Sequence, residues 1–347
     1  TIVTGITVTK KIHSELLSDK KNIHNNLGLE TVLADLPDNT EKNNILRAES
    51  CPGSPTTIPG GSGNYNITVA GSYLLGGART GDITITANDT CLSLNNFKLT
   101  GRIIINGANA KVINGTIEPV AATTNPLAED AAITINSSGT GAQILDLTVT
   151  CLALSDLTAN PPSADGINGR LAIKNQANFV QIRGCIITAA KGQGFNITTA
   201  IALTINRPTG AGGIGNWNDQ VTDILIQNCT VAAGASGGIT VSNTSTTATS
   251  IGYGGTATIG AGGEGVYTSG ANIQILSSTI TAGSSGAISA TGNSSGVIQI
   301  ARAITPNSNV AIGAGGNGIY SSGNNTLITG CTIIAGSSGG ITENSTG

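Results

Sequence analysis

Charged residues are scarce in this sequence. They account for 10% of its 347 residues, and the formal net charge at pH 7 is −3. Lys and Arg form no basic stripe, so neither nucleic acid nor an anionic membrane surface is expected as a partner. No run of about 18 apolar residues occurs, so no membrane span is predicted.

Aromatic residues are also rare (3%), Met is absent, and the 6 Cys include no Cys-x-x-Cys pair. Because the Cys are not spaced as metal ligands are, we predict no metal site and no cofactor. A chain that begins at Thr1 and lacks Met is what removal of a signal peptide would leave. We therefore expect a secreted protein, either extracellular or held at the cell surface.

The sequence is rich instead in Gly (49 residues), Asn, Thr, Ile and Val, a composition typical of short strands joined by tight turns. One six-residue pattern recurs, which we call the rung motif. It consists of an apolar residue, any residue, a small or polar residue, a variable residue, usually Thr, and an apolar residue. Its copies are Leu94–Leu99, Val112–Ile117, Ile144–Val149, Ile182–Ile187, Ile226–Val231, Ile275–Ile280 and Ile328–Ile333.

A second repeat recurs at the same spacing as the last four rung motifs. Near copies occur at Ala233–Ile239, Ala282–Ile288 and Ala335–Ile341, with a weaker copy at Ala189–Phe195, and they are spaced 44, 49 and 53 residues apart like the last four rung motifs. A fixed period predicts a solenoid, in which the apolar ends of the motif point inward and stack from coil to coil. Each unit is long enough for two coils, and the scarcity of helix formers predicts coils made of strands.

A known family resembles the first part of this repeat region. The stretch from Gly71 to Gly101 (GSYLLGGARTGDITITANDTCLSLNNFKLTG) resembles the opening coils of right-handed parallel β-helix proteins of the pectin-lyase-like superfamily, with departures at Thr90, Cys91, Ser93 and Asn96. With the later coils, the resemblance covers about residues 60–347 and implies an all-β parallel β-helix. We predict an amino-terminal arm and cap over 1–50 and the β-helix over 51–347.

Members of that superfamily include polysaccharide hydrolases and lyases. The resemblance therefore makes a polysaccharide-degrading enzyme one of the functions to consider. The acidic signatures of these enzymes are weak here: Asp146, Asp165 and the pair Glu129-Asp130 are the candidates, and Gln193 stands where the hydrolases have His. Glycoside hydrolysis needs two carboxylates at a defined separation, and lyase chemistry needs a base with charge neutralisation. We therefore predict no catalytic residue and expect that the protein is not an enzyme.

Three Gly-x-Gly-x-x-Gly matches, at Gly210–Gly215, Gly260–Gly265 and Gly313–Gly318, suggest dinucleotide loops when read alone. Such a loop needs a helix after it, and here a strand-like segment follows instead. The match also recurs once per unit. We interpret the glycines as corners that need a positive φ.

Cysteines and tyrosines also follow the repeat. Cys185, Cys229 and Cys331 share one rung-motif position with Phe97, Gly115, Leu147 and Ser278, so they are expected in the core. Cys51 and Cys91 could pair in a disulfide. Tyr267 and Tyr320 are equivalent, and an aromatic row on one face could bind glycans, as in an adhesin or fibre module.

The arm and the last coil carry the leading hypothesis. Residues 1–9 (TIVTGITVT) are β-prone, and the last coil is expected to leave its strand edges unpaired. We predict a structural subunit of an extracellular filament or surface layer that binds copies of itself, head to tail, by strand addition. The interface residues would be Ile2, Val3, Ile6, Val8 and Ile341.

Overall fold

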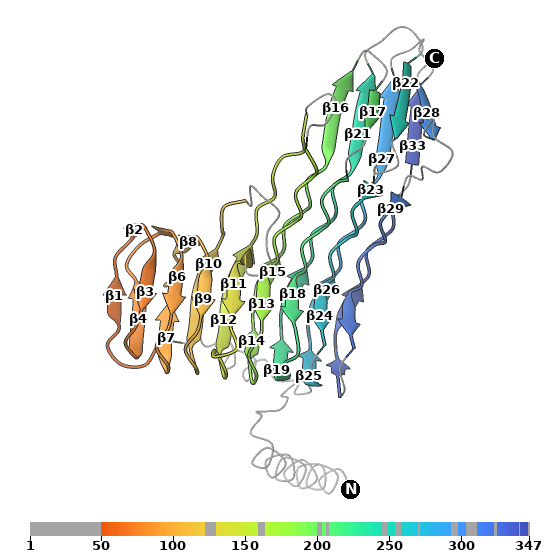
Figure 1. Ribbon diagram of the computed structural model, residues 1–347. Helices are drawn as coiled ribbons and strands as arrows, with labels where there is room; N and C mark the ends of the chain where they lie inside the picture. The colour runs from red at the N-terminus through yellow and green to blue at the C-terminus, as the bar shows by residue number, and fades with distance from the viewer. Residues whose placement is uncertain are drawn as a thin grey trace, which may run out of the picture. The chain divides into compact units, whose positions relative to one another are not determined.

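The computed structural model describes residues 50–121, 130–158, 164–199, 203–205, 208–243, 249–253, 258–269, 271–292, 298–302, 311–322, 325–339 and 341–345. These residues form strands and turns, and no α-helix occurs among them. The described strands pair in parallel, each with its counterpart in the neighbouring coil, as Figure 1 shows. The fold is a right-handed parallel β-helix, as the sequence predicted.

Sheet A is the largest sheet and has sixteen strands, because most coils contribute two short strands to it. The bend between these two strands is the middle of the rung motif. The strands are β1 (Thr56–Ile58), β2 (Gly61–Ser62), β4 (Gly71–Leu75), β5 (Arg79–Thr80), β7 (Thr90–Ser93), β8 (Lys98–Thr100), β10 (Lys111–Ile117), β12 (Gln143–Thr150), β14 (Gln181–Arg183), β15 (Ile186–Thr188), β19 (Thr222–Gln227), β20 (Thr230–Ala232), β25 (Ala271–Leu276), β26 (Thr279–Thr281), β31 (Leu327–Thr329) and β32 (Thr332–Ile334).

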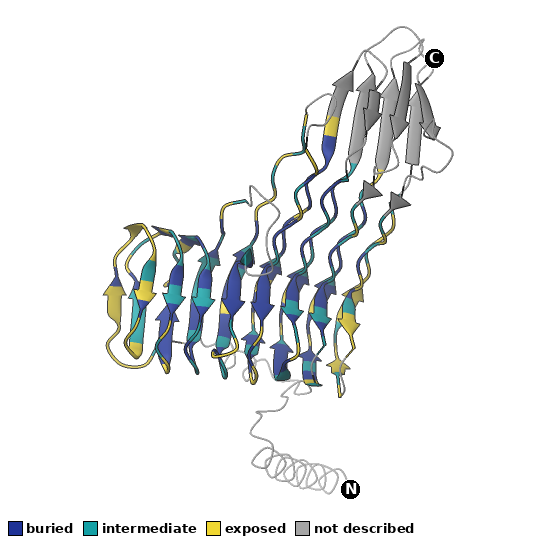
Figure 2. Cartoon of the chain, viewed as in Figure 1, coloured by how far each residue is buried: buried dark blue, intermediate teal, exposed yellow. Residues whose placement is uncertain are grey.

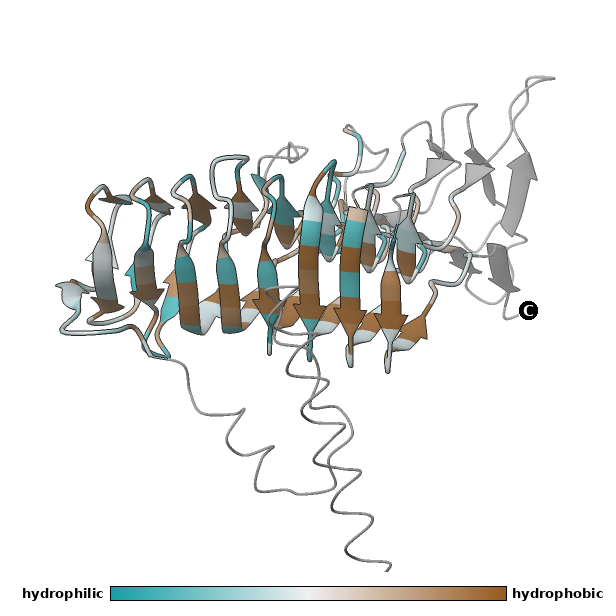
Figure 3. Ribbon diagram, turned by 90° about the horizontal axis from the view of Figure 1, so that it is seen from below, coloured by the Kyte–Doolittle hydropathy of each residue, from teal (hydrophilic) through white to brown (hydrophobic). Residues whose placement is uncertain are grey.

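Sheet B lies on the opposite side of the coils and receives one strand from each. Its eight strands are β3 (Tyr65–Ile67), β6 (Ile83–Ile85), β9 (Ile103–Ile105), β11 (Ile133–Ile135), β13 (Ile173–Asn175), β18 (Asn216–Asn218), β24 (Val266–Thr268) and β30 (Ile319–Ser321). The inward side chains of sheets A and B form one continuous apolar core, visible as brown bands that cross neighbouring strands in Figure 3.

The two apolar ends of the rung motif build the core columns. Strand pairing aligns its first residue through Val112, Ile144, Ile182, Ile226, Ile275 and Ile328. It aligns the last residue through Leu99, Ile117, Val149, Ile187, Val231, Ile280 and Ile333. All but the last member of each column are fully buried. The predicted inward stacking is therefore confirmed.

Consecutive rung motifs lie in adjacent coils, so each unit contains a single coil. Ile226 pairs directly with both Ile182 and Ile275. The prediction of two coils per unit is wrong. The extra residues leave the β-helix after sheet A and return before sheet B, forming three small parallel sheets. Sheet C contains β16 (Phe195–Thr199), β21 (Ile239–Asn243), β27 (Ile288–Gly292) and β33 (Ile341–Ser345); sheet D contains β17 (Leu203–Ile205), β22 (Thr249–Tyr253) and β28 (Ile298–Arg302); sheet E contains β23 (Thr258–Ile259) and β29 (Ala311–Ile312).

Glycine-rich segments carry the chain out and back, and we call them the glycine double layer. The outgoing segments are 189–194, 233–238, 282–287 and 335–339, and the returning segments are 209–215, 260–265 and 313–318. Backbone hydrogen bonds alternate between the two layers: Gly234 donates to Gly213 O at 2.9 Å, and Gly263 donates to Gly234 O at 2.9 Å. The repeated Gly-Gly motifs thus form a packed lattice of backbones.

Close approach explains these glycines, which recur at every third position. A Cβ on Gly234 would lie 1.8 Å from Ala190 O, and one on Gly213 would lie 2.2 Å from Arg170 O. None of the glycines in these segments has a positive φ. Our prediction of positive-φ corners is therefore wrong, and the reason is crowding, as in other three-residue-period packings where only Gly fits.

Candidate functional site

The coil formed by β30, β31 and β32, which we call the terminal coil, differs from the coils before it. Its Ile328 and Ile333 occupy the two core columns but are 41% and 45% exposed, whereas the aligned Ile275 and Ile280 are fully buried. Figure 2 shows the change as yellow segments beside the blue strands of the preceding coil. The terminal coil therefore presents an apolar surface along the axis of the solenoid.

Backbone groups of the terminal coil add to this surface. β30, β31 and β32 pair with β24, β25 and β26 of the preceding coil. Within the described part of the chain, no further strand pairs with their other edges. In the described residues, N–H and C=O groups along these edges thus have no strand partner, and strand addition uses groups of this kind.

At the other end of the described β-helix, the second coil places a charged side chain against the first coil. Arg79 occupies a core column, in register with Leu99, and only 7% of it is exposed. Its guanidinium donates to Pro59 O at 3.0 Å and Gly63 O at 2.7 Å and lies 5.4 Å from the ring centroid of Tyr65. Sequence reasoning missed this contact, although an Arg at an otherwise apolar position was the available signal.

An aromatic column runs along sheet B. Trp217, Tyr267 and Tyr320 are aligned by strand pairing, with ring centroids 6.2 Å apart for the first pair and 5.2 Å for the second. The rings of Tyr267 and Tyr320 are nearly parallel, at 5°. Lys174 precedes them in the column, with its Nζ 5.5 Å from the centre of the Trp217 ring. Each ring therefore stacks on its neighbours, and the faces of Tyr267 are covered.

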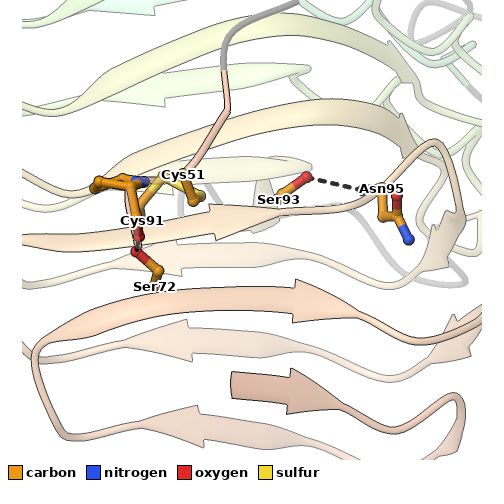
Figure 4. Close-up of a disulfide and its surroundings, with 6 residues drawn as sticks. Cys51, Ser72, Cys91, Ser93 and Asn95 are labelled. Atoms are coloured by element: carbon orange, nitrogen blue, oxygen red, sulfur yellow. Dashed lines mark hydrogen bonds between the residues drawn. A yellow bond between two sulfur atoms is a disulfide. The ribbon is translucent and has the colours of Figure 1, made fainter. Parts of the chain in front are cut away.

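Cys51 and Cys91 form a disulfide, with the sulfur atoms 2.10 Å apart and the Cα atoms 5.5 Å apart (Figure 4). Cys91 points out of β7 but is only 6% exposed, because Cys51, Ile113 and Leu145 pack around it. Ser72 Oγ donates to Pro52 O at 2.5 Å beside it. The disulfide and this hydrogen bond tie the segment before β1 to the outer face of sheet A.

The rung-motif cysteines are packing residues. Cys185 and Cys229 lie in adjacent coils and are 1% and 2% exposed, and Cys331 is partly exposed in the terminal coil. The hydrogen bond with Cys229, together with burial, raises the pKa of the Cys185 thiol well above its usual value. Burial also raises the pKa of Cys151 to about 12. Since the thiolate is the reactive form, Cys151 and Cys185 are not poised as nucleophiles.

The acidic residues singled out in the sequence lie in separate places. Asp146 occupies the bend of a rung motif on β12, Asp165 is exposed in the segment before β13, and Asp130 pairs with Arg102 at 2.7 Å. Glu129 lies outside the described residues. Gln193 is buried, and its amide donates to Ser155 O at 2.8 Å and accepts from Ile167 N at 3.3 Å. Gln193 thus links the segment that contains Ser155 to the segment that contains Ile167.

Among the described residues, no group of three or more His, Cys, Asp and Glu is placed to hold a metal ion. In the same part of the chain, no helix is long and apolar enough to cross a membrane. The arm residues Ile2, Val3, Ile6 and Val8 lie outside the described residues. Ile341 begins β33, where it pairs with Ile288 in sheet C, so it belongs to the small sheets and not to the terminal coil.

Comparison with known proteins finds a similarity among solved structures and none in sequence. No family model matches this sequence, and no curated protein matches it. Among solved structures, the A-module of the mannuronan C-5 epimerase AlgE4 of Azotobacter vinelandii is similar, with 12% sequence identity over 85% of this chain and 91% of that chain and a TM-score of 0.16.

That neighbour is an enzyme, which contradicts our prediction that this chain has no enzymatic activity. The prediction relied on missing hydrolase and lyase signatures, and such signatures belong to particular families and not to the fold. We therefore withdraw it. The likeness is too distant to assign an activity to this chain.

Proposed function

We propose that the protein is a structural subunit that assembles end to end through its terminal coil, into a filament or layer outside the cell. One observation carries the proposal: the two core columns reach Ile328 and Ile333, whose side chains remain 41% and 45% exposed. A stacked solenoid gains stability from each neighbouring interface. In the described residues, the terminal coil has one such interface, with the preceding coil.

The energy available for assembly is substantial. Full burial of an Ile side chain contributes about 1.5–3 kcal/mol. Leu327, Ile334 and Tyr320 are also exposed on the terminal coil, next to the open strand edges. Covering this surface would bury several large apolar groups and satisfy backbone groups at the same time.

A second copy of this chain is the proposed partner, and the difference between the two ends supports it. Ile58 and Ile67 in the first coil are buried and Arg79 donates to two carbonyl groups of that coil, while Ile328 and Ile333 in the terminal coil are exposed. A contact between two different surfaces of the same chain is heterologous, and repetition of it builds an open filament. An extracellular location suits the Cys51–Cys91 disulfide, because oxidising compartments maintain such bonds.

Glycan binding by the aromatic column has less support. Sugars stack on the flat faces of aromatic rings. Trp217 and Tyr320 cover the two faces of Tyr267. The outer face of Tyr320 points along the axis, toward whatever covers the terminal coil, so the column suits axial stacking better than a lateral ligand.

The test is to image the full chain by negative-stain microscopy and to measure its mass by light scattering over a range of concentrations. We expect rods longer than one subunit, and we expect Ile333→Asp to remain monomeric. Thr230→Asp, which changes an exposed residue two coils earlier, is the matched control and should assemble normally. A full chain that stays monomeric at every concentration would contradict the proposal.

A further inference from the structure

The amino-terminal arm contains an eighth copy of the rung motif. Residues Val3-Thr-Gly-Ile-Thr-Val8 align with Ile328-Thr-Gly-Cys-Thr-Ile333 of the terminal coil. Thr, Gly and Thr are identical, and each of the other three positions holds Val or Ile in the arm. The residue before each segment, Ile2 or Leu327, is apolar as well. The arm therefore has the sequence of a coil segment, although it is far from the other copies along the sequence.

The third position of the motif is the most demanding, because it adopts a left-handed backbone conformation. In the described copies, φ at this position is positive in every case: Asn96, Asn114, Asp146, Gly184, Asn228, Ser277 and Gly330 have φ values between 48° and 65°. Only Gly, and less readily Asn or Asp, adopts this conformation at low cost. Gly5 stands at this position in the arm.

The fourth position points into the core. It holds Leu147, Cys185, Cys229 and Ser278, which are 1–2% exposed. In the arm this position is Ile6, and the two column positions are Val3 and Val8. The three arm residues that align with inward positions of the described copies are thus apolar, while Thr7 aligns with Thr332, which is exposed on the terminal coil.

We propose that residues 3–8 of a second copy add as a parallel strand pair onto β31 and β32, with Val3 over Ile328, Gly5 over Gly330, Ile6 over Cys331 and Val8 over Ile333. This proposal rests on the end-to-end assembly proposed above and names its contact. The added segment extends both core columns by one residue and bonds to the open strand edges of sheet A. The arm is the proposed occupant because residues 3–8 repeat the motif of the terminal coil, whereas the first coil has the Arg79 guanidinium against its carbonyl groups.

Thiol cross-linking tests the register. Parallel neighbours lie about 4.8 Å apart, so a cysteine introduced by Ile6→Cys would lie next to Cys331. A short bifunctional thiol reagent should then convert Ile6→Cys into a ladder of covalent multimers. Ile6→Cys with Cys331→Ser removes the partner thiol, and Thr7→Cys points the new thiol outward; neither should give the ladder. Cys151, Cys185 and Cys229 are buried and should not react.

Gly5 provides a second test that needs no reagent. Asn occupies the third position in three other copies, so Gly5→Asn should leave assembly within about threefold of that of the unchanged chain. A Val is costly at positive φ, so Gly5→Val should weaken association about tenfold. Deletion of residues 1–9 should abolish it. Sedimentation velocity measures all three.

The outcomes separate the two proposals. If the full chain assembles but Gly5→Val and the deletion assemble equally well, the arm is not the contact and end-to-end assembly stands. Cross-linking within one monomer would place the arm on its own terminal coil and would also overturn the inference. If the full chain does not assemble at all, both proposals are wrong.

Discussion

Ile328 lies in register with Ile275 in the preceding coil, yet Ile275 is fully buried and Ile328 is 41% exposed. The two residues have the same side chain, the same motif position and the same strand direction. What differs is that Ile275 has a coil on both sides, whereas in the described chain Ile328 has one. Within a solenoid, burial is a property of neighbouring coils and not of the residue alone.

Matched truncations of these two residues should therefore separate folding from assembly. Ile275→Ala removes fully buried methyl groups and should lower the free energy of unfolding by about 2–5 kcal/mol. Ile328→Ala should cost clearly less in a monomer, because its side chain is already partly in water, and should instead raise the concentration needed for assembly. Urea unfolding of dilute protein measures the first effect, and light scattering at high concentration the second. Equal losses of unfolding free energy in the two variants would contradict this explanation.

The glycine double layer makes a separate prediction. Gly234→Ala places a Cβ 1.8 Å from Ala190 O, in a lattice whose neighbouring backbones are themselves hydrogen-bonded. Such overpacking costs about 1–3 kcal/mol or forces the layers apart. The neighbouring substitution Ala235→Ser is the control, since the equivalent residues Ser284 and Ser337 are already Ser. Thermal unfolding followed by circular dichroism should show a lower midpoint for Gly234→Ala only.

The core of the fold could be predicted from the sequence because its period is read directly. The rung motif has apolar residues at both ends, and the second repeat, at Ala233–Ile239 and its copies, recurs at the same spacing. This combination leaves few alternatives to stacked coils. The lengths of 44, 49 and 53 residues were ambiguous, since extra residues can form a second coil or an excursion. Gly at every third residue, as in Gly234 and Gly237, was the signal that favoured the excursion.

The surfaces were harder to predict than the core. Aligned Tyr267 and Tyr320 suggested a binding row, but sequence alone does not reveal that their rings stack on each other. Arg79 was not singled out in the sequence, yet its guanidinium donates to two carbonyl groups of the first coil. Whether a side chain faces solvent depends on the adjacent coil, which local sequence does not specify.

Acid should weaken the β-helix through Asp82. Burial raises the pKa of this carboxyl, but hydrogen bonds and the positive charge of Arg102, with a contribution from Arg170, outweigh it and hold the pKa below 3.8. Arg102 donates to Asp82 Oδ2 at 2.7 Å and also pairs with Asp130. Because the pKa is lower in the folded chain, Asp82 stabilises the fold above its unfolded pKa, and this contribution is lost as pH falls through the folded pKa.

Asp82→Asn should therefore remove part of the pH dependence. Above about pH 5 the variant should unfold at lower urea concentration than the unchanged protein, and the difference should shrink as pH falls below about 4. Urea titrations between pH 2.5 and 7 measure it. A difference that stays constant across that range would show that Asp82 contributes packing alone.

Asn228 tests why the rung motif has its form. Its φ of 53° is positive, as at the equivalent Gly184 and Gly330, although Asn carries a Cβ and Gly does not. If the left-handed bend is the reason for the choice of residue, Asn228→Gly should change the free energy of unfolding by only a few tenths of a kcal/mol, whereas Asn228→Ala should lose about 1 kcal/mol. Denaturant unfolding of both variants decides it. Loss in Asn228→Gly as large as in Asn228→Ala would instead mean that the Asn side chain, and not the backbone conformation, holds neighbouring coils together.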